Sequence, residues 1–131
     1  MKVQESAENY LETILILSQR HSPVRSVDIA GELDYSKPSV SVAMKHLRGD
    51  GYISVDGDGA IALTDKGRAI AETMYERHVL ISDWLIFLGV DKKIAVHDAC
   101  KMEHVISGQS FDAIKRHVEN WKRDIYAQRE E

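Results

Sequence analysis

Three side chains in the C-terminal third of the sequence have the types and spacing of a metal site. Cys100, Glu103 and His104 stand at positions i, i+3 and i+4, so on a helix they share one face. A thiolate, a carboxylate and an imidazole together suit Fe(II), Mn(II), Co(II), Ni(II) or Zn(II) better than Mg(II) or Ca(II). The same spacing also fits a solvated Glu–His pair beside a small buried cysteine, so the triple alone leaves both interpretations open.

Further candidate donors lie elsewhere in the chain. Asn9 and Glu12 are three residues apart on the first predicted helix, and His78 lies on a long predicted helix. Each also has an ordinary interpretation: a surface amide, a surface carboxylate and a hydrogen-bonded, half-buried histidine. With the triple they form a candidate ligand set of six residues.

The elements that must position these residues are mostly helical. Apolar residues recur at helical spacing over residues 7–19, 27–33, 36–48, 64–88, 91–105 and 110–126. Runs of β-forming residues at 52–55 and 61–63 flank two Asp-Gly pairs and predict a β-hairpin. We expect helices to begin at Ser26, Ser36, Asp91 and Ser110, and the long helix to end at Gly89.

Three helices followed by a hairpin have the order of a winged helix-turn-helix. The outward face of the third helix carries small hydroxyl and ammonium side chains, which can reach phosphates or base edges in the major groove. The same core can serve protein contacts, and charge discriminates weakly, because residues 20–55 hold five basic and four acidic side chains. The candidate DNA contacts are Arg25, Ser36, Lys37, Pro38, Ser39, Ser41, Val42 and Lys45.

Composition sets the outer limits. The 131 residues, 44% apolar and 29% charged, suit one compact domain or a small domain with a dependent second one. A net charge of −4 means that DNA binding must rest on local charge or on bound cations. The single cysteine excludes an intramolecular disulfide. The longest apolar run, 84–90, is too short to span a membrane, and no signal pattern precedes it, so we expect a cytoplasmic protein without a membrane partner.

Over about residues 5–121 the chain resembles the diphtheria toxin repressor and manganese transport regulator family of metal-dependent repressors. The segments that carry the resemblance are SAENYLETI at 6–14, VDIAGELDYSKPSVSVAMKHLRGDGYI at 27–53, ALTDKGRAIAE at 62–72, RHVLISDWL at 77–85 and HDACKMEHVIS at 97–107. The resemblance implies a mainly α fold, with a winged helix-turn-helix domain over residues 1–70 and a helical metal-binding and dimerisation domain over 71–131. It also implies a homodimer that binds palindromic double-stranded operator DNA and has no enzymatic activity.

The resemblance also assigns ligands. Cys100, Glu103 and His104 match the family's interdomain ligand motif, and a cysteine at position 100 is similar to the iron-responsive branch. Glu12 and His78 match ligand positions of the manganese branch. Asn9 stands where that branch has a carboxylate, and its amide oxygen brings no charge to a cation.

On the DNA side, Ser36, Pro38 and Ser39 match contact positions of the family. Val42 stands where the iron branch has a glutamine, which implies an apolar contact to a thymine methyl group instead of a hydrogen bond.

The favoured function is therefore a transcriptional repressor that responds to Fe(II) or Mn(II) and controls metal homeostasis, with Zn(II), Co(II) or Ni(II) able to substitute. The alternative is a metal-independent winged-helix regulator, in which Cys100→Ala and His104→Ala would leave DNA binding unchanged. A metallohydrolase would need a metal-bound water, a nearby base and a substrate cleft, and so short a chain gives no sign of that cleft.

Overall fold

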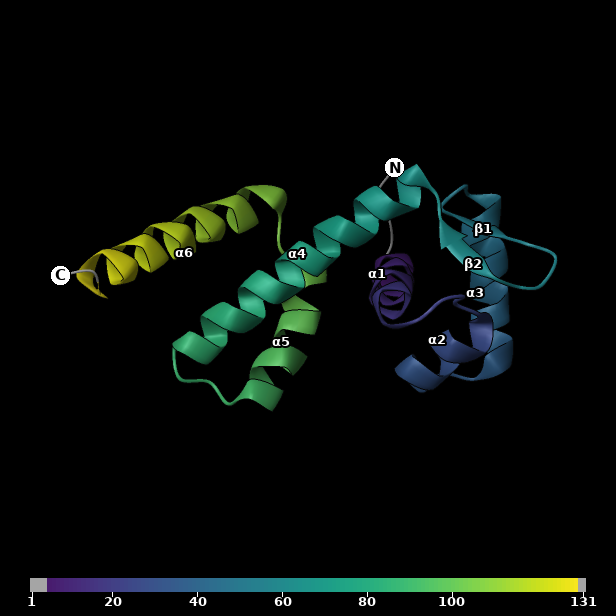
Figure 1. Cartoon of the computed structure of the whole chain (residues 1–131), viewed down its shortest axis with the longest axis horizontal. Coiled ribbons are helices and arrows are strands. Elements are labelled where there is room, and N and C mark those ends of the chain that lie inside the picture. Colours follow the sequence, from purple (N-terminus) through teal and green to yellow (C-terminus); the bar gives the residue numbers. More distant parts are fainter. Residues whose placement is uncertain (1–4, 130–131) are drawn as a thin grey trace. The chain divides into compact units, whose positions relative to one another are not determined.

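The structure is a computed structural model that describes residues 5–129. Figure 1 shows the order α1 (Glu5–Arg20), α2 (Ser26–Leu33), α3 (Lys37–Gly49), β1 (Ile53–Val55), β2 (Ile61–Leu63), α4 (Asp65–Phe87), α5 (Lys92–Val105) and α6 (Gly108–Arg129). The predicted mainly helical class is confirmed. The chain divides into two compact units, one ending at Tyr75 and the other beginning at Glu76.

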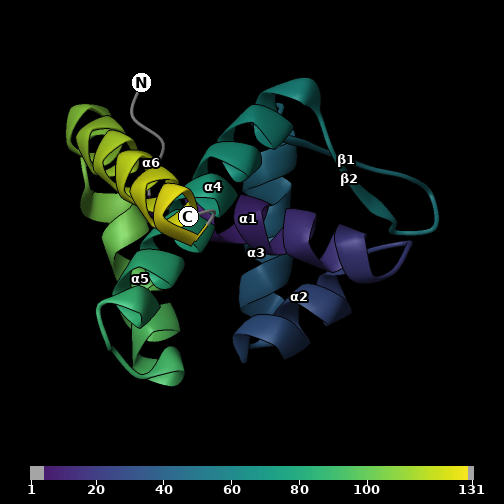
Figure 2. The same ribbon diagram turned by 60° about the vertical axis from the view of Figure 1, so that its left-hand side comes forward.

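In the first unit, α1, α2 and α3 pack around one apolar core, and the hairpin follows α3 (Figure 2). Leu11, Ile14, Ile29 and Val40 are at most 1% exposed and form the centre of that core. The strands pair antiparallel, with Ile53 opposite Leu63. This arrangement leaves the opposite side of α3 open to solvent.

Two helix starts in this unit show how capping residues set the boundaries. Ser36 is the N-cap of α3, as predicted, and its hydroxyl accepts the Ser39 N–H at 3.3 Å. The prediction for Ser26 was wrong by one residue, because Arg25 holds the N-cap position of α2. The Asp28 carboxylate accepts the Arg25 N–H at 2.8 Å and fixes that start.

In the second unit, α4, α5 and α6 share an apolar core, and Ile81, Ala99 and Phe111 form its centre. Asp91 caps α5, as predicted, with its carboxylate accepting the Lys93 N–H at 3.2 Å. The expected start of the last helix at Ser110 was wrong, because α6 begins at Gly108. Within residues 5–129, no helix combines the length and apolarity that a membrane crossing requires.

Gly67, in the first turn of α4, lies against the backbone of Tyr52, and a Cβ atom there would overlap the Tyr52 carbonyl. That carbonyl also accepts the Thr64 N–H at 3.1 Å, so it cannot move away without breaking the start of α4. We expect Gly67→Ala to lower the free energy of unfolding by about 1–3 kcal/mol, the usual range for overpacking. Urea denaturation followed by circular dichroism measures this change.

Gly31 provides the matched control for this prediction, because it lies within α2 and a Cβ atom there would meet nothing within 4 Å. Gly31→Ala should be neutral or stabilising by up to ~1 kcal/mol, since alanine favours helix more than glycine does. Equal denaturation midpoints for Gly67→Ala and the unsubstituted protein would contradict the proposed overlap.

Candidate metal centre

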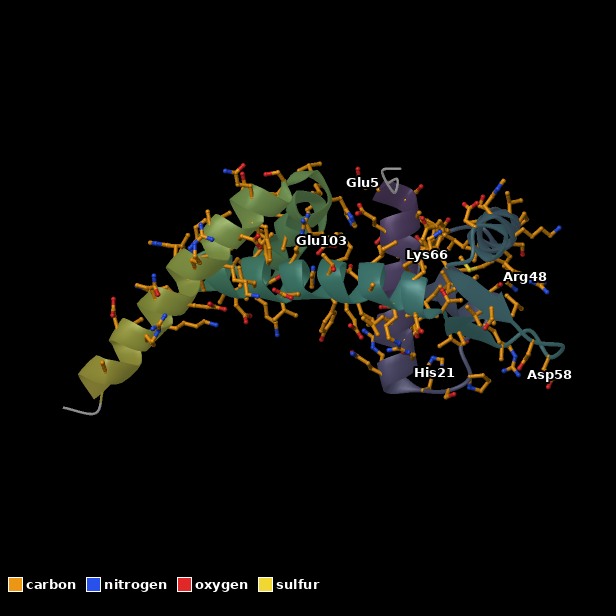
Figure 3. The ribbon with its side chains drawn as sticks, turned by 90° about the horizontal axis from the view of Figure 1, so that it is seen from above. Glu5, His21, Arg48, Asp58, Lys66 and Glu103 are labelled. Atoms are coloured by element: carbon orange, nitrogen blue, oxygen red, sulfur yellow. The ribbon has the colours of Figure 1, made fainter. Side chains whose placement is uncertain are left out.

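A buried carboxylate in the second unit lies between two imidazoles. Glu103 Oε2 is 3.2 Å from His78 Nδ1, and Glu103 Oε1 is 3.3 Å from His104 Nε2. The side chains of Glu103 and His104 are 0% and 1% exposed, whereas that of His78 is 22% exposed. Figure 3 labels Glu103 on α5. Three side chains with nitrogen or oxygen donors are thus gathered here, two of them buried and the third partly exposed.

The packing of α4 against α5 creates this cluster. Glu103 and His104 are consecutive residues in the last turn of α5, and His78 lies in the middle of α4. Ala95 and Ala99 are 0% exposed, and such small side chains let two helices approach closely. The His78 imidazole of α4 lies within reach of the α5 carboxylate, with 3.2 Å between His78 Nδ1 and Glu103 Oε2.

The donor set fits a divalent transition metal. Imidazole nitrogen and carboxylate oxygen suit Mn(II), Fe(II) and Zn(II). Ligand bonds of about 2.0–2.2 Å at tetrahedral or octahedral angles place neighbouring ligand atoms roughly 3.0–3.5 Å apart. The two nitrogen–oxygen distances of 3.2 and 3.3 Å each fall in that range, and each involves a different oxygen of Glu103. A cation would also compensate the cost of burying a carboxylate.

The other predicted ligands lie on two helices. Cys100 is half-buried on α5, one helical turn before His104. Asn9 is half-buried and Glu12 is buried on α1, which belongs to the first unit. The structure places His78 and His104 next to the two carboxylate oxygens of Glu103, and the roles of all six residues as ligands stay predictions.

The predicted DNA contacts are all solvent-exposed in the first unit. The exposed residues are Arg25, Ser36, Lys37, Pro38, Ser39, Ser41, Val42 and Lys45. The opposite side of α3 is buried in the core through Val40, Met44 and Leu47, as the apolar spacing predicted. The exposed face of α3 is therefore available for a partner, and its contact with DNA stays a prediction.

Arg25 differs from the other predicted contacts, because its side chain is directed to the hairpin. Its Nε atom donates a hydrogen bond to the Asp58 carbonyl at 3.3 Å. Asp58 lies in the turn between β1 and β2, at the far end of the hairpin in Figure 3. Arg25 therefore supplies positive charge to a hairpin turn that is otherwise acidic.

One residue of the cluster was missed by the sequence analysis. Arg77 precedes His78 on α4, and its Nη1 atom donates to the backbone carbonyls of Glu103 and Ile106, each at 2.9 Å. Residue spacing cannot reveal this contact, because it depends on which turns of α4 and α5 meet.

Comparison with known proteins finds one matching family domain in each half of the chain. Residues 2–61 match the N-terminal DNA-binding domain of the iron-dependent repressors, and residues 64–130 match their metal-binding and dimerisation domain. A helix-turn-helix transcriptional regulator of Methanocaldococcus jannaschii is 32% identical over 125 residues, which cover 94% of this chain and all of that protein. The transcriptional regulator MntR of Escherichia coli is 34% identical over 112 residues, which cover 86% of this chain and 72% of that protein.

Solved structures extend the comparison. A manganese-dependent transcriptional repressor in complex with manganese shares 26% identity and a TM-score of 0.79 over 86% of this chain. The metal-dependent transcriptional regulator MtsR shares 27% identity and a TM-score of 0.80 over 86% of this chain. The match covers 52% and 53% of those two chains, so this chain spans about half of their length. Both domain matches and both relatives lead to one conclusion: the chain belongs to the iron-dependent repressor family of metal-responsive, DNA-binding transcriptional regulators.

Proposed function

We propose that the chain represses transcription by binding palindromic operator DNA as a homodimer when Fe(II) or Mn(II) is bound, and so controls metal homeostasis in the cytoplasm. The observation that carries the proposal is the buried His78–Glu103–His104 cluster. A buried carboxylate between two imidazoles has little structural purpose that an apolar side chain would not serve better. In a DNA-binding family, a metal-sensing role accounts for it.

The proposed ligands are His78, Glu103 and His104, together with the Cys100 thiolate one turn away on α5. From the first unit we add Glu12 and the Asn9 amide oxygen. The bound cation supplies positive charge that offsets the carboxylates of Glu12 and Glu103. Because the Cys100 thiol must lose its proton to become a ligand, metal binding should strengthen as the pH rises.

With ligands drawn from both units, metal occupancy would restrict where the recognition helix α3 can point. In a dimer this fixes the spacing between two α3 helices, which must reach successive major grooves on one side of the duplex. The effect of metal on operator affinity is a coupling free energy, typically ~1–3 kcal/mol. It corresponds to roughly 5–150-fold in the dissociation constant.

An exposed apolar surface in the second unit suits the dimer contact. It covers the end of α4 and the start of α5, and its members are Ile86, Phe87, Leu88, Ile94 and Val96, between 38% and 61% exposed. A groove of about 360 Å³ between α4 and α6, lined partly by Trp84 and Trp121, adjoins it through Phe87. Exposed apolar side chains gathered at the connection between α4 and α5 suit an interaction surface.

We expect Leu88→Glu to shift the dimer toward monomer by at least ~10-fold in dissociation constant. A buried unpaired carboxylate costs several kcal/mol at an interface. Sedimentation equilibrium measures the change. Val105→Glu is the control, because Val105 is 76% exposed at the other end of α5. A dimer of unchanged strength in Leu88→Glu would place the dimer contact elsewhere.

The proposed function is tested by selecting binding sites from a random DNA pool with the protein in Mn(II), or anaerobically in Fe(II), and in chelator. A palindromic consensus enriched only with metal supports the proposal. Enrichment of the same consensus in chelator would instead support the metal-independent regulator. In that case Cys100→Ala and His104→Ala would also leave DNA binding unchanged.

A further inference from the structure

Arg77 and His78 are neighbours on α4, and both contact Glu103 of α5 by different groups. His78 Nδ1 lies 3.2 Å from the Glu103 carboxylate, while Arg77 Nη1 donates to the Glu103 backbone carbonyl at 2.9 Å. The same Nη1 atom also donates to the Ile106 carbonyl at 2.9 Å. Arg77 therefore hydrogen-bonds to the backbone of Glu103, and its neighbour His78 contacts the Glu103 side chain.

The Glu103 carbonyl, which accepts a hydrogen bond from Arg77, lies near the C-terminal end of α5. Ile106 N–H donates to the Met102 carbonyl at 3.2 Å, and α5 ends at Val105. The carbonyls that follow Met102 lack the next helical amides and need other donors. A guanidinium at this position satisfies one of them and places positive charge at the negative end of the helix.

Arg77 also contacts α6. Its guanidinium carbon lies 5.4 Å from the centroid of the Phe111 ring, within the range of a cation–π interaction. Phe111 is 5% exposed and packs in the first turn of α6. One side chain thus joins three elements of the second unit at the end of α5 that carries Glu103 and His104.

We propose that Arg77 is a positioning residue for the metal centre: it fixes the register of α5 against α4, so that the carboxylate of Glu103 and the ring of His104 meet His78 before metal arrives. This inference rests on the proposed function. Preorganised ligands bind more tightly, because the ordering they would otherwise need is already complete. Loss of outer partners that orient ligands typically lowers metal affinity by about 10–100-fold.

If Arg77 had only a structural role, substituting it would change folding stability alone. The test must therefore measure the affinity and geometry of the metal ligands. Arg77→Met keeps the length of the side chain and removes its hydrogen bonds and charge, whereas Arg77→Lys retains a cationic donor. Lys115→Met is the matched control. Lys115 on α6 forms a 2.6 Å ion pair with Glu76 on α4, which joins helices of the same unit without touching a proposed ligand.

The readouts are the Mn(II) dissociation constant by calorimetry and the visible absorption spectrum of the Co(II)-loaded protein, which depends on ligand geometry. We expect Arg77→Met to raise the Mn(II) constant about 10-fold or more and to alter the Co(II) spectrum. In Arg77→Lys, the Mn(II) constant and the Co(II) spectrum should lie close to those of the unsubstituted protein. In Lys115→Met, both should be unchanged. If Arg77→Met does not fold, Arg77→Gln replaces it, with the same expected result.

A wild-type Mn(II) constant and Co(II) spectrum in the folded Arg77 variant would overturn the inference, whatever its melting temperature. An equal loss of affinity in Lys115→Met would overturn it too, since any loosening of the unit would then suffice. If the unsubstituted protein bound neither Mn(II) nor Co(II), the proposed function itself would fail, and that result is distinct from the other two.

Discussion

Glu103→Gln is expected to weaken Mn(II) binding by roughly 100-fold or more, because even the loss of an outer partner of a ligand lowers affinity by about 10–100-fold. The glutamine keeps the shape of the side chain and removes its charge. Glu103 is 0% exposed and lies next to both His78 and His104, so the substitution removes the negative charge at the middle of the cluster. Operator affinity in Mn(II) should fall to the level seen in chelator. Calorimetry and fluorescence anisotropy measure the two losses.

Glu119→Gln is the control for this change, because it removes the same charge from an exposed position of α6 in the same unit. It should bind Mn(II) and operator as the unsubstituted protein does. Circular dichroism in chelator separates loss of metal affinity from loss of fold. A folded Glu103→Gln protein that bound Mn(II) within about threefold of the original would remove Glu103 from the metal centre.

Val42→Glu should abolish specific operator binding and leave Mn(II) binding intact. Val42 is 55% exposed in the middle of α3, on the face opposite Val40 and Met44. Loss of the apolar contact to a thymine methyl group would remove the readout of one base pair, which typically costs about 1–3 kcal/mol. A carboxylate there also adds repulsion from the phosphates. The combined loss should reach ~100-fold or more in the operator dissociation constant, measured by anisotropy at fixed salt.

Ala69→Glu is the matched control, because it adds the same charge to an exposed position of α4. Its operator affinity should change only slightly. Lys37→Ala and Lys45→Ala should each lower the slope of log affinity against log salt by about one, as expected for one phosphate contact apiece. Full-strength operator binding by Val42→Glu would mean that α3 does not enter the major groove through this face.

The order of elements and most boundaries could be predicted from the sequence, because capping residues are local signals. Ser36 and Asp91 cap α3 and α5 as expected. The two misplaced starts have one physical cause, since more than one residue could accept the first amides of the helix. At α6, Ser107 Oγ accepts the Ser110 N–H at 3.1 Å, so Ser110 lies inside the helix. At α2, the N–H groups of Asp28 and Ile29 donate to the Arg25 carbonyl at 3.0 and 3.3 Å, so Arg25 and not Ser26 is the N-cap.

The candidate site was predictable only in part. The spacing of Glu103 and His104 within one helix could be predicted from the sequence, since helical geometry alone determines it. Two contacts depend on the register between α4 and α5. They are the contact of Glu103 with His78 and the hydrogen bond from Arg77 to the Glu103 carbonyl. Tertiary packing sets that register, and a single sequence carries no local signal for it.

The most direct test of metal gating measures one coupling from both sides. The operator dissociation constant is determined in chelator and in saturating Mn(II), and the Mn(II) constant is determined for free protein and for protein saturated with operator. If metal gates DNA binding, the two ratios must be equal, and we expect each to be at least about fivefold. A protein that binds Mn(II) equally well on and off its operator would contradict the gating account, however tightly it binds either partner.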